Sequence, residues 1–176
     1  MSTAQVQKAT SVAVPLSVGA LVAVALGVYG RLHDPTGVAI NLAGFSSFLA
    51  VKTWLATLAA VLGLVQLASA VALYRGHPKV APLHRWSGRA AVAATLPVVA
   101  HCLYALGFQY DEPRILIHSL LGCFFYGAFV AKMLTLTRTD APKWLLPVVG
   151  GALFTALIGL WLTSALWFFT TFGVIR

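Results

Sequence analysis

The chain has 176 residues, of which 60% are hydrophobic and 9% are charged, and its mean hydropathy is +0.88. Lysine and arginine number 12 against 4 acidic residues, which gives a formal net charge of +8 at pH 7. This composition excludes an ordinary soluble domain and indicates an integral membrane protein. The basic residues lie in short segments between apolar stretches, so we interpret them as topology signals and not as a nucleic-acid-binding surface.

Five apolar stretches are long enough to cross a hydrocarbon core of roughly 30 Å, which needs about 20 residues per helix. They cover approximately residues 12–28, 48–73, 86–106, 115–136 and 145–169. We therefore predict an all-α membrane protein, a single integral membrane domain (1–176) that folds as a five-helix transmembrane bundle. The second to fifth spans are expected to form a four-helix cofactor-binding core, with the first span packed at its edge. Only Lys8 precedes the first span and no small-residue cleavage site follows it, so we interpret this span as a retained helix.

The basic residues predict the orientation of the chain in the membrane. When the connections are assigned alternately to the two sides, one side holds Lys8, Arg75, Lys79, Arg85, Arg89, Lys132, Arg138 and Lys143, and the other holds Arg31, Lys52, Arg114 and Arg176. Because basic residues concentrate on the cytoplasmic side, this split predicts a multi-pass plasma-membrane protein with a cytoplasmic N-terminus and the C-terminus outside. The connection at 32–47 is expected to be an outer loop with an interfacial portion.

The third and fourth spans each carry a histidine close to the turn that joins them. His101 lies about six residues before the turn and His118 about five after it, so both are roughly 7–9 Å below the outer end at about 1.5 Å per residue. Ionisable side chains at membrane depth mark functional sites, and neutral imidazole is a good ligand for iron. The matched depth predicts that His101 and His118 are the ligands of one buried iron, held as haem b.

Two histidines are followed four residues later by a glycine: His118 by Gly122, and His84 by Gly88. Residues i and i+4 lie one above the other on a helix, so this spacing leaves room beside the imidazole for a flat macrocycle. A ligand role for His84 would imply a second, inner haem, with only the loop residue His77 as a partner on that side. Membership of the basic interfacial cluster at 84–89 explains His84 equally well. One haem is the prediction, and two is the alternative.

Two basic residues and two cysteines, within the spans or directly beside them, also need an interpretation: Lys52, Arg114, Cys102 and Cys123. Lys52 and Arg114, near the outer ends of the second and fourth spans, are candidates to pair with haem propionates or with a quinone. Cys102 and Cys123 are interpreted as small apolar fillers, and no C-x-x-C-H motif for covalent haem attachment is present. Zinc is a weaker alternative for the histidine pair, because it usually takes three or four protein ligands and no aspartate or glutamate lies nearby in the spans.

At His84-Arg85-x-x-Gly88 and His118-x-x-x-Gly122 the chain resembles the cytochrome b561 and ferric-reductase-like transmembrane superfamily, whose small helical bundles bind b-type haem through histidines. The resemblance covers about residues 48–169 and rests on short motifs. It implies electron transfer from ascorbate, quinol or a nicotinamide-flavin partner to ferric iron or another redox protein. The chain departs from the di-haem pattern, because its second and fifth spans contain no histidine.

The predicted function is therefore a membrane-bound b-type cytochrome that relays electrons from quinol to a redox partner at the outer face. No G-x-G-x-x-G loop is present, so the reductant is expected to be lipid-borne or carried by a partner protein. If the protein is an enzyme, it is expected to be a quinol-linked or ferric-reductase-like oxidoreductase subunit, as a homo-oligomer or within a larger complex. The alternative is a cofactor-free structural or assembly subunit, which the small residues of the second and third spans would suit. A small transporter is less favoured, because no inverted repeat is visible.

Overall fold

The computed structural model describes residues 3–38 and 46–174, and this part of the chain is helical with no β-strand. The helices are α1 (Thr3–Leu32), α2 (Phe48–Tyr74), α3 (Ala81–His101), α4 (Pro113–Leu136), α5 (Leu145–Trp161) and the short α6 (Trp167–Phe172). Three short elements connect or extend them: the 3-10 turn η1 (Pro78–Val80) and the π-helical turns η2 (Cys102–Leu106) and η3 (Leu162–Leu166).

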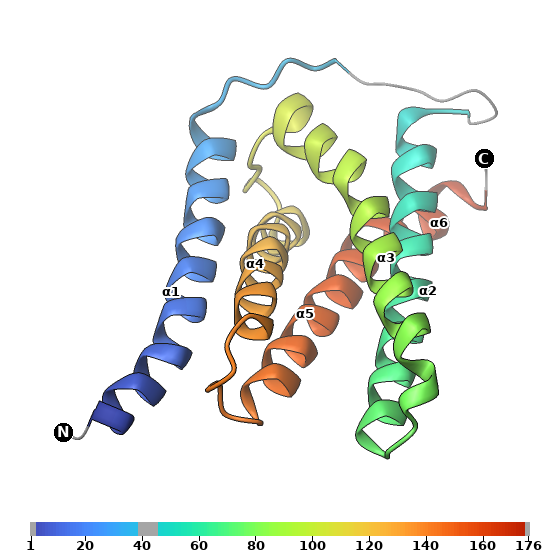
Figure 1. The fold of residues 1–176 in the computed structure, drawn as a ribbon. Helices are drawn as coiled ribbons and strands as arrows, with labels where there is room; N and C mark the ends of the chain where they lie inside the picture. The colour runs from blue at the N-terminus through green and yellow to red at the C-terminus, as the bar shows by residue number, and fades with distance from the viewer. Residues whose placement is uncertain (1–2, 39–45, 175–176) are drawn as a thin grey trace.

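Within residues 3–38 and 46–174, five helical stretches are long and apolar enough to cross a membrane. Figure 1 shows how these helices are arranged. They are Ala9–Leu32, Phe48–Tyr74, Pro78–Leu106, Pro113–Leu136 and Leu145–Phe172. The predicted five-helix bundle is confirmed, and the protein is a multi-pass membrane protein. Several helices are longer than predicted, such as α1 (Thr3–Leu32) against the predicted 12–28. Hydropathy detects only the apolar part of a helix, whereas the backbone hydrogen bonds continue into the polar residues at its ends. Of the predicted loop at 32–47, residues 39–45 lie outside the described part of the chain.

The helix ends follow from local sequence. Ser47 caps α2, because its hydroxyl oxygen accepts a hydrogen bond from the Ala50 N–H at 3.2 Å. Pro113 opens α4, where its fixed φ and missing N–H suit the first helical position. Gly107 ends the third span with φ +69, a left-handed conformation that favours glycine. Gly107 and Pro113 set the limits of the turn between the third and fourth spans.

The helices pack as neighbouring pairs (Figure 1): α1 along α4, α2 along α3, and α5 against both α4 and α2. A core cluster at the centre of the bundle joins α2, α3, α4 and α5, and consists of Ala59, Ala94, Phe125, Ala156 and Leu157. Three of these five residues are alanines, which let the helix backbones approach closely. The second to fifth spans therefore form the centre of the bundle, and α1 packs at its edge, as predicted.

The contact between α1 and α4 depends on two glycines. A Cβ atom on Gly19 would lie 2.5 Å from the Gly127 carbonyl oxygen and 2.8 Å from the Ala131 Cβ. A Cβ atom on Gly127 would lie equally close to the Gly19 carbonyl oxygen and to the Ala23 Cβ. Each helix thus presents a glycine followed four residues later by an alanine, a small-residue pattern that permits backbone contact between membrane helices.

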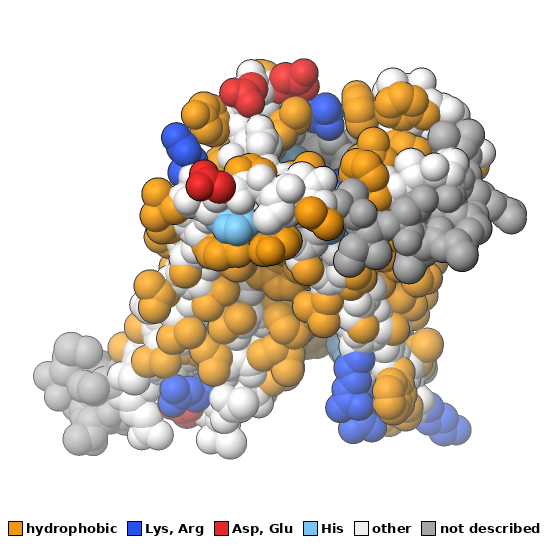
Figure 2. Space-filling model, turned by 90° about the horizontal axis from the view of Figure 1, so that it is seen from above, with side chains coloured by type: hydrophobic (Ala, Val, Ile, Leu, Met, Phe, Trp, Pro, Cys, Tyr) orange, Lys and Arg blue, Asp and Glu red, His pale blue; other side chains and the backbone are white. Residues whose placement is uncertain are grey.

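The two ends of the bundle differ in charge. We call the end that carries Asp34, Asp111 and Glu112 the acidic end, and the end that carries Arg75, Lys79, Arg85 and Lys143 the basic end. Residues 33–38, which follow α1, and the α3–α4 connection lie at the acidic end (Figure 1). Figure 2 looks onto this end and shows acidic side chains there, with a group of basic side chains beyond it at the far end of the bundle.

Candidate functional site

A cavity of about 480 Å³ lies among the second to fifth spans, toward the acidic end. Its volume falls within the roughly 300–1,000 Å³ typical of sites for small molecules and cofactors. On the side of the core cluster it is bounded by Phe125 and Leu157, and by the Tyr126 hydroxyl, which donates to Thr95 Oγ1 at 2.9 Å and joins α4 to α3. The lining is mostly apolar, but it includes the polar side chains of Lys52, Gln109, Arg114, His118, Ser119 and Thr163.

His118 lines this cavity, and its protonation state follows from its hydrogen bonds. The His118 Nδ1 atom lies 2.9 Å from Thr163 Oγ1. The Thr163 hydroxyl donates its single proton to the Gly159 carbonyl oxygen at 2.8 Å, so Thr163 Oγ1 accepts the bond from His118. Nδ1 therefore carries the ring proton and Nε2 carries a lone pair. Histidines that bind metals are commonly held in this way, with the second ring N–H donated to a fixed acceptor.

If the cavity binds the predicted haem, Thr163→Val is expected to weaken that binding without removing the ligand His118. Valine keeps the shape of threonine but offers no acceptor to His118 Nδ1, so the tautomer and the orientation of the ring are no longer fixed. Loss of such a partner lowers affinity by about 10- to 100-fold. The measurement is haem retained per chain during dilution into haem-free detergent. Thr170→Val is the matched control, because Thr170 is exposed and donates to the Leu166 carbonyl oxygen away from the cavity; equal retention by both variants would contradict this role of Thr163.

His101 ends α3, and its imidazole packs against the Phe48 ring of α2 with the ring centroids 5.2 Å apart. It does not line the cavity, although its neighbours Val98 and Cys102 do. Within the described residues, His101 Nε2 is a buried side-chain atom with no hydrogen-bond partner. Leaving a buried polar atom unpaired costs about 1–3 kcal/mol. The structure therefore brings His118, but not His101, into the cavity, and leaves the His101 ring nitrogen in need of a partner.

Two π-helical turns border the cavity at the acidic end. The turn η2 follows directly after His101, and η3 contains Thr163, the residue that holds His118. Both turns contribute residues to the lining. Single π-turns inside helices are rare and are found frequently at functional sites. Neither turn contains glycine or proline, so no sequence signal indicates them.

The two cations that the sequence singled out both line the cavity. The Lys52 ammonium lies 5.8 Å from the centroid of the Phe48 ring and is close enough to His101 and His118 to interact electrostatically with both. Within the part of the chain that the structure describes, Lys52 forms no ion pair with a carboxylate. Its charge is therefore available to an anionic ligand in the cavity.

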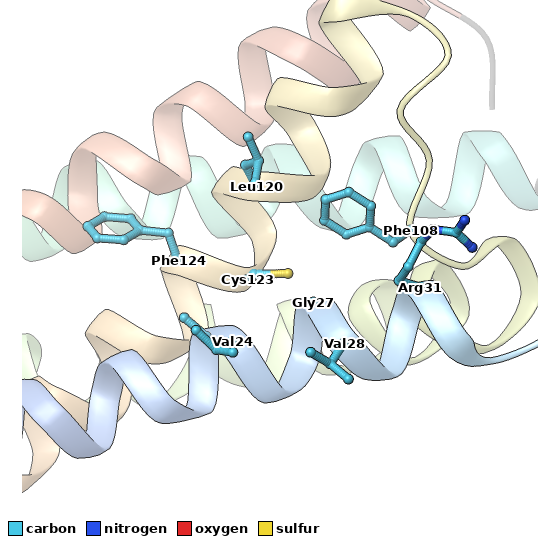
Figure 3. A pocket seen from close by; sticks show the side chains of 9 residues that line it. Val24, Gly27, Val28, Arg31, Phe108, Leu120, Cys123 and Phe124 are labelled. Carbon is cyan, nitrogen blue, oxygen red and sulfur yellow. The ribbon is translucent and has the colours of Figure 1, made fainter.

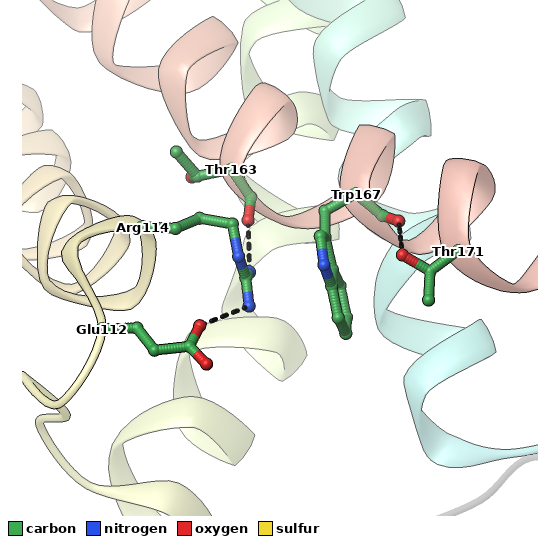
Figure 4. A network of polar contacts seen from close by, with 5 residues as sticks. All are labelled: Glu112, Arg114, Thr163, Trp167 and Thr171. Atoms are coloured by element: carbon green, nitrogen blue, oxygen red, sulfur yellow. Dashed lines mark hydrogen bonds and ion pairs between the residues drawn. The ribbon is translucent and has the colours of Figure 1, made fainter.

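Arg114 is held by the protein itself (Figure 4). Its guanidinium donates to the Thr163 carbonyl oxygen at 2.9 Å, lies 3.6 Å from a Glu112 carboxylate oxygen, and stacks over the Trp167 ring at 4.2 Å from the centroid. Glu112 is largely exposed, so this ion pair is weak. Arg114 thus fixes the start of α4 against η3 and α6, and it places a positive charge beside the cavity.

Gly122 and Gly88, the glycines expected to leave room beside His118 and His84, have different surroundings. A Cβ atom on Gly122, which lines the cavity, would meet Leu160 Cδ2 at 4.0 Å and nothing closer, so this face of α4 is open. A Cβ atom on Gly88 would lie 3.0 Å from the side-chain amide of Gln66 on α2. The room that the sequence predicted beside Gly88 is therefore filled, because Gln66 packs there and donates to the His84 carbonyl oxygen and to Ser87 Oγ.

His84 lies toward the basic end, apart from the residues of the cavity. Its Nδ1 atom is 2.9 Å from Ser69 Oγ, which itself donates to the Val65 carbonyl oxygen at 2.7 Å. By the argument applied to His118, Nδ1 carries the proton of His84 and Nε2 carries a lone pair. The structure thus fixes His84 in a form that can bind a metal, but the room for a macrocycle expected beside Gly88 is taken up by Gln66.

The cavity offers few protein ligands to a metal ion. Within the described residues, no three side chains of histidine, cysteine, aspartate or glutamate come together. A protein zinc site usually needs three or four such ligands. A haem needs only axial ligands from the protein, because its macrocycle supplies the other nitrogens. Cys102 and Cys123, which we interpreted from the sequence as small apolar fillers, are free thiols, and both line the cavity.

Comparison with known proteins gives a family for the chain. No curated protein and no solved structure matches it. One family model, described as a family of unknown function (DUF6529), matches residues 12–176. The match begins within α1 and includes the whole central cavity. Because it covers far more than half of the sequence, the chain belongs to the DUF6529 family.

Proposed function

We propose that this protein is a membrane-bound b-type cytochrome that relays electrons from a quinol in the bilayer to a redox protein at the acidic end. The observation that carries this proposal is His118, which lines a central cavity with its Nδ1 proton donated to Thr163 and its Nε2 lone pair left for a ligand. We propose the cytochrome b561 and ferric-reductase-like superfamily as the related group, on the motif at His118 and Gly122.

Several features of the cavity fit a haem. The open face beside Gly122 leaves room for a flat ring, and Lys52 offers a positive charge to a propionate. The unpaired Nε2 of His101 is a second nitrogen that needs a partner. When bound there, a haem iron supplies one-electron redox chemistry at a potential set by its axial ligands and burial.

The protein's own residues would orient the cofactor and keep the site dry. Thr163 holds the His118 ring in one tautomer, and Phe125 and Leu157 close the cavity with apolar surface. Coordination by both histidines requires the His101 imidazole to leave the Phe48 ring and turn toward the cavity. The π-turn directly after His101 is the part of α3 where such a change would be accommodated.

The direction of electron flow follows from the proposed orientation, with the N-terminus in the cytoplasm and the acidic end outside the plasma membrane. Oxidation of one quinol to quinone releases two electrons and two protons. Two molecules of an acceptor that takes one electron each would therefore be reduced per quinol.

Absorption spectroscopy of the detergent-purified full chain tests the proposal. We expect a sharp reduced α band of b type after dithionite, with about one haem per chain in a pyridine haemochrome assay, as one pair of histidine ligands implies. A value of two would assign His84 to a second haem. A folded protein without haem, after expression with an adequate haem supply, would overturn the proposal.

That last outcome would favour the alternative, a cofactor-free structural subunit of a larger membrane complex. The sequence supported this alternative through small residues in the second and third spans. In the structure, Ala59 and Gly63 of α2, and Ala91 and Ala94 of α3, are buried within the chain. These four residues serve the packing of the bundle itself, whereas Ala90 and Ala93 of α3 are exposed and keep a small-residue face that a partner helix could contact.

A further inference from the structure

The outer surface of α3 carries two arginines and a tryptophan near the basic end. Arg85, Trp86 and Arg89 share one side of the helix, because residues three and four apart are neighbours on a helix surface, and all three are exposed. The other side of α3 bears Ser87, which is buried and bonded to Gln66 of α2. At about 1.5 Å per residue, Arg85 lies roughly 6 Å and Arg89 roughly 12 Å from the start of α3. Positive charge is thus placed on a part of the third span that faces lipid.

The Arg89 side chain turns back toward the basic end. Its guanidinium carbon lies 5.1 Å from the centroid of the Trp86 ring, which belongs to the turn of α3 nearer the helix start. Long basic side chains of membrane helices extend in this way to bring the charged group to the interface. Trp86 is 67% exposed, and tryptophan concentrates at membrane interfaces. The stacked pair brings the charge of Arg89 toward the layer that holds Arg85.

No acidic group of the chain balances these charges. The sequence contains no aspartate or glutamate between Asp34 and Asp111. Among residues 3–38 and 46–174, the side chains of Arg85, Trp86 and Arg89 form no ion pair and no hydrogen bond with another residue. Like charges four residues apart on a helix also repel each other. The two guanidinium groups and the indole N–H therefore present unpaired donors to a negatively charged ligand.

Membrane topology alone does not account for this arrangement. Basic residues in the connections suffice to orient a membrane protein, and Arg75 and Lys79, in the connection between α2 and α3, supply them. Arg89 instead lies inside the third span (Pro78–Leu106), on its exposed side. An ionisable side chain at such a position is costly unless it finds a partner. Because this side of α3 faces away from the other helices, the partner must come from the surrounding lipid.

The lipid-facing surface between α1 and α4 has a different character. A groove of about 400 Å³ lies there (Figure 3), and Arg31 is the charged residue among those that line it. The Arg31 guanidinium stacks on the Tyr110 ring at 5.3 Å from the centroid. The other lining residues are apolar, apart from the Cys123 thiol. This groove offers a lipid head group one cation, whereas the surface of α3 offers two cations and an indole N–H side by side.

We infer that Arg85, Trp86 and Arg89 form a binding site for the phosphate of an anionic phospholipid in the leaflet at the basic end. Guanidinium groups bind phosphate oxygens through paired, charge-assisted hydrogen bonds, and the indole N–H supplies a further donor. Arg75 and Lys79, exposed at the same end, add attraction for a head group with a net negative charge. A zwitterionic phospholipid has the same phosphate but carries a cation that opposes this attraction. The site therefore selects anionic lipid, whether or not the cavity holds haem.

Native mass spectrometry of the full chain in a nonionic detergent tests the inference, by titration with phosphatidylglycerol and separately with phosphatidylcholine. We expect the wild type to bind phosphatidylglycerol at least about tenfold more tightly than phosphatidylcholine. Arg85→Gln with Arg89→Gln should lower the affinity for phosphatidylglycerol at least about tenfold, because two arginine–phosphate contacts are removed. The matched control is Arg138→Gln with Lys143→Gln, which removes two exposed charges from the α4–α5 connection and should bind nearly as the wild type does.

The other outcomes would overturn the site. Equal affinity for the two lipids, or equal losses in the two double variants, would show a diffuse attraction and no defined site. Displacement of phosphatidylglycerol by an equal concentration of inorganic phosphate would show a site for soluble anions. If Arg85→Gln with Arg89→Gln does not insert into the membrane, Arg85→Lys with Arg89→Lys keeps both charges but loses the paired guanidinium donors. Unchanged affinity in that variant would contradict the inference as well.

Discussion

Under the proposed function, replacing His118 by alanine is expected to yield a folded but colourless protein, with haem content below about a tenth of the wild-type value, because the proposed axial ligand is removed. His118 is the ligand candidate whose ring nitrogen is both freed by a hydrogen bond to Thr163 and placed in the cavity. The measurement is haem per chain, with folding followed by gel filtration and helical content by circular dichroism. His101→Ala is expected to lower haem content as well and to shift the reduced α band, since it removes the residue proposed as the second axial ligand.

The control for His118 is His77→Ala. His77 is exposed in the connection between α2 and α3, at the basic end. It should retain full colour. A second test uses His118→Gly with added free imidazole. Imidazole should occupy the space left by the side chain and restore part of the b-type absorption spectrum. Full haem content in His118→Ala would show that the assigned ligand is wrong.

Replacing Gly127 by leucine is expected to have the largest effect on stability. Any side chain at this position meets the Gly19 carbonyl oxygen, with a Cβ distance of 2.5 Å, so the α1 backbone must move. Overpacking of this kind costs about 1–3 kcal/mol or more. We expect a lower thermal unfolding temperature in detergent and the separation of α1 from α4. Gly150→Leu is the control, because its Cβ position is free of neighbours, and it should unfold close to the wild-type temperature.

Separation of α1 can be measured directly. In a Cys102→Ser background, Gly27→Cys places a second thiol close to Cys123, since a Cβ at residue 27 lies 3.8 Å from Cys123 Sγ. Mild oxidation should link the two residues when α1 is docked. The link should fail to form when Gly127→Leu is added. Efficient cross-linking in the combined variant would show that α1 tolerates a side chain at this crossing.

The sequence predicted the spans because the length of an apolar stretch is a local property. Both ends of α2 and the C-terminal end of the third span agree with the expected limits to within a residue, and the turn before α4 lies at the predicted place. The third span begins at Pro78, eight residues before the predicted start. The depth of His101 and His118 near that turn could also be predicted, since rise along a helix depends only on residue number. Lys52, Arg114 and Gly122 were found by the same reasoning, and all three line the cavity.

Sequence reasoning missed the residues that act from a neighbouring helix. Thr163 lies in the fifth span, which contains no histidine. The only feature of the sequence that could have indicated its role is a hydroxyl group within an apolar stretch. The glycine–alanine spacing at Gly19 and Gly127 was a signal that could have been read, since it occurs in two different spans. The role of Gln66, which fills the space beside Gly88, could not be predicted from the sequence, because it depends on which face of α2 packs against α3.

What the sequence by itself determined is the membrane class of the protein, the number and approximate positions of its spans, and the distance along the chain from each ionisable side chain to the end of its span. Only the tertiary structure decided how each helix is rotated about its own axis. That rotation turns His118 toward the cavity and packs His101 against Phe48. The physical reason is that the hydropathy and the rise of a helix depend only on its own residues. The rotation of a membrane helix about its axis depends on close packing and hydrogen bonds with the neighbouring helices.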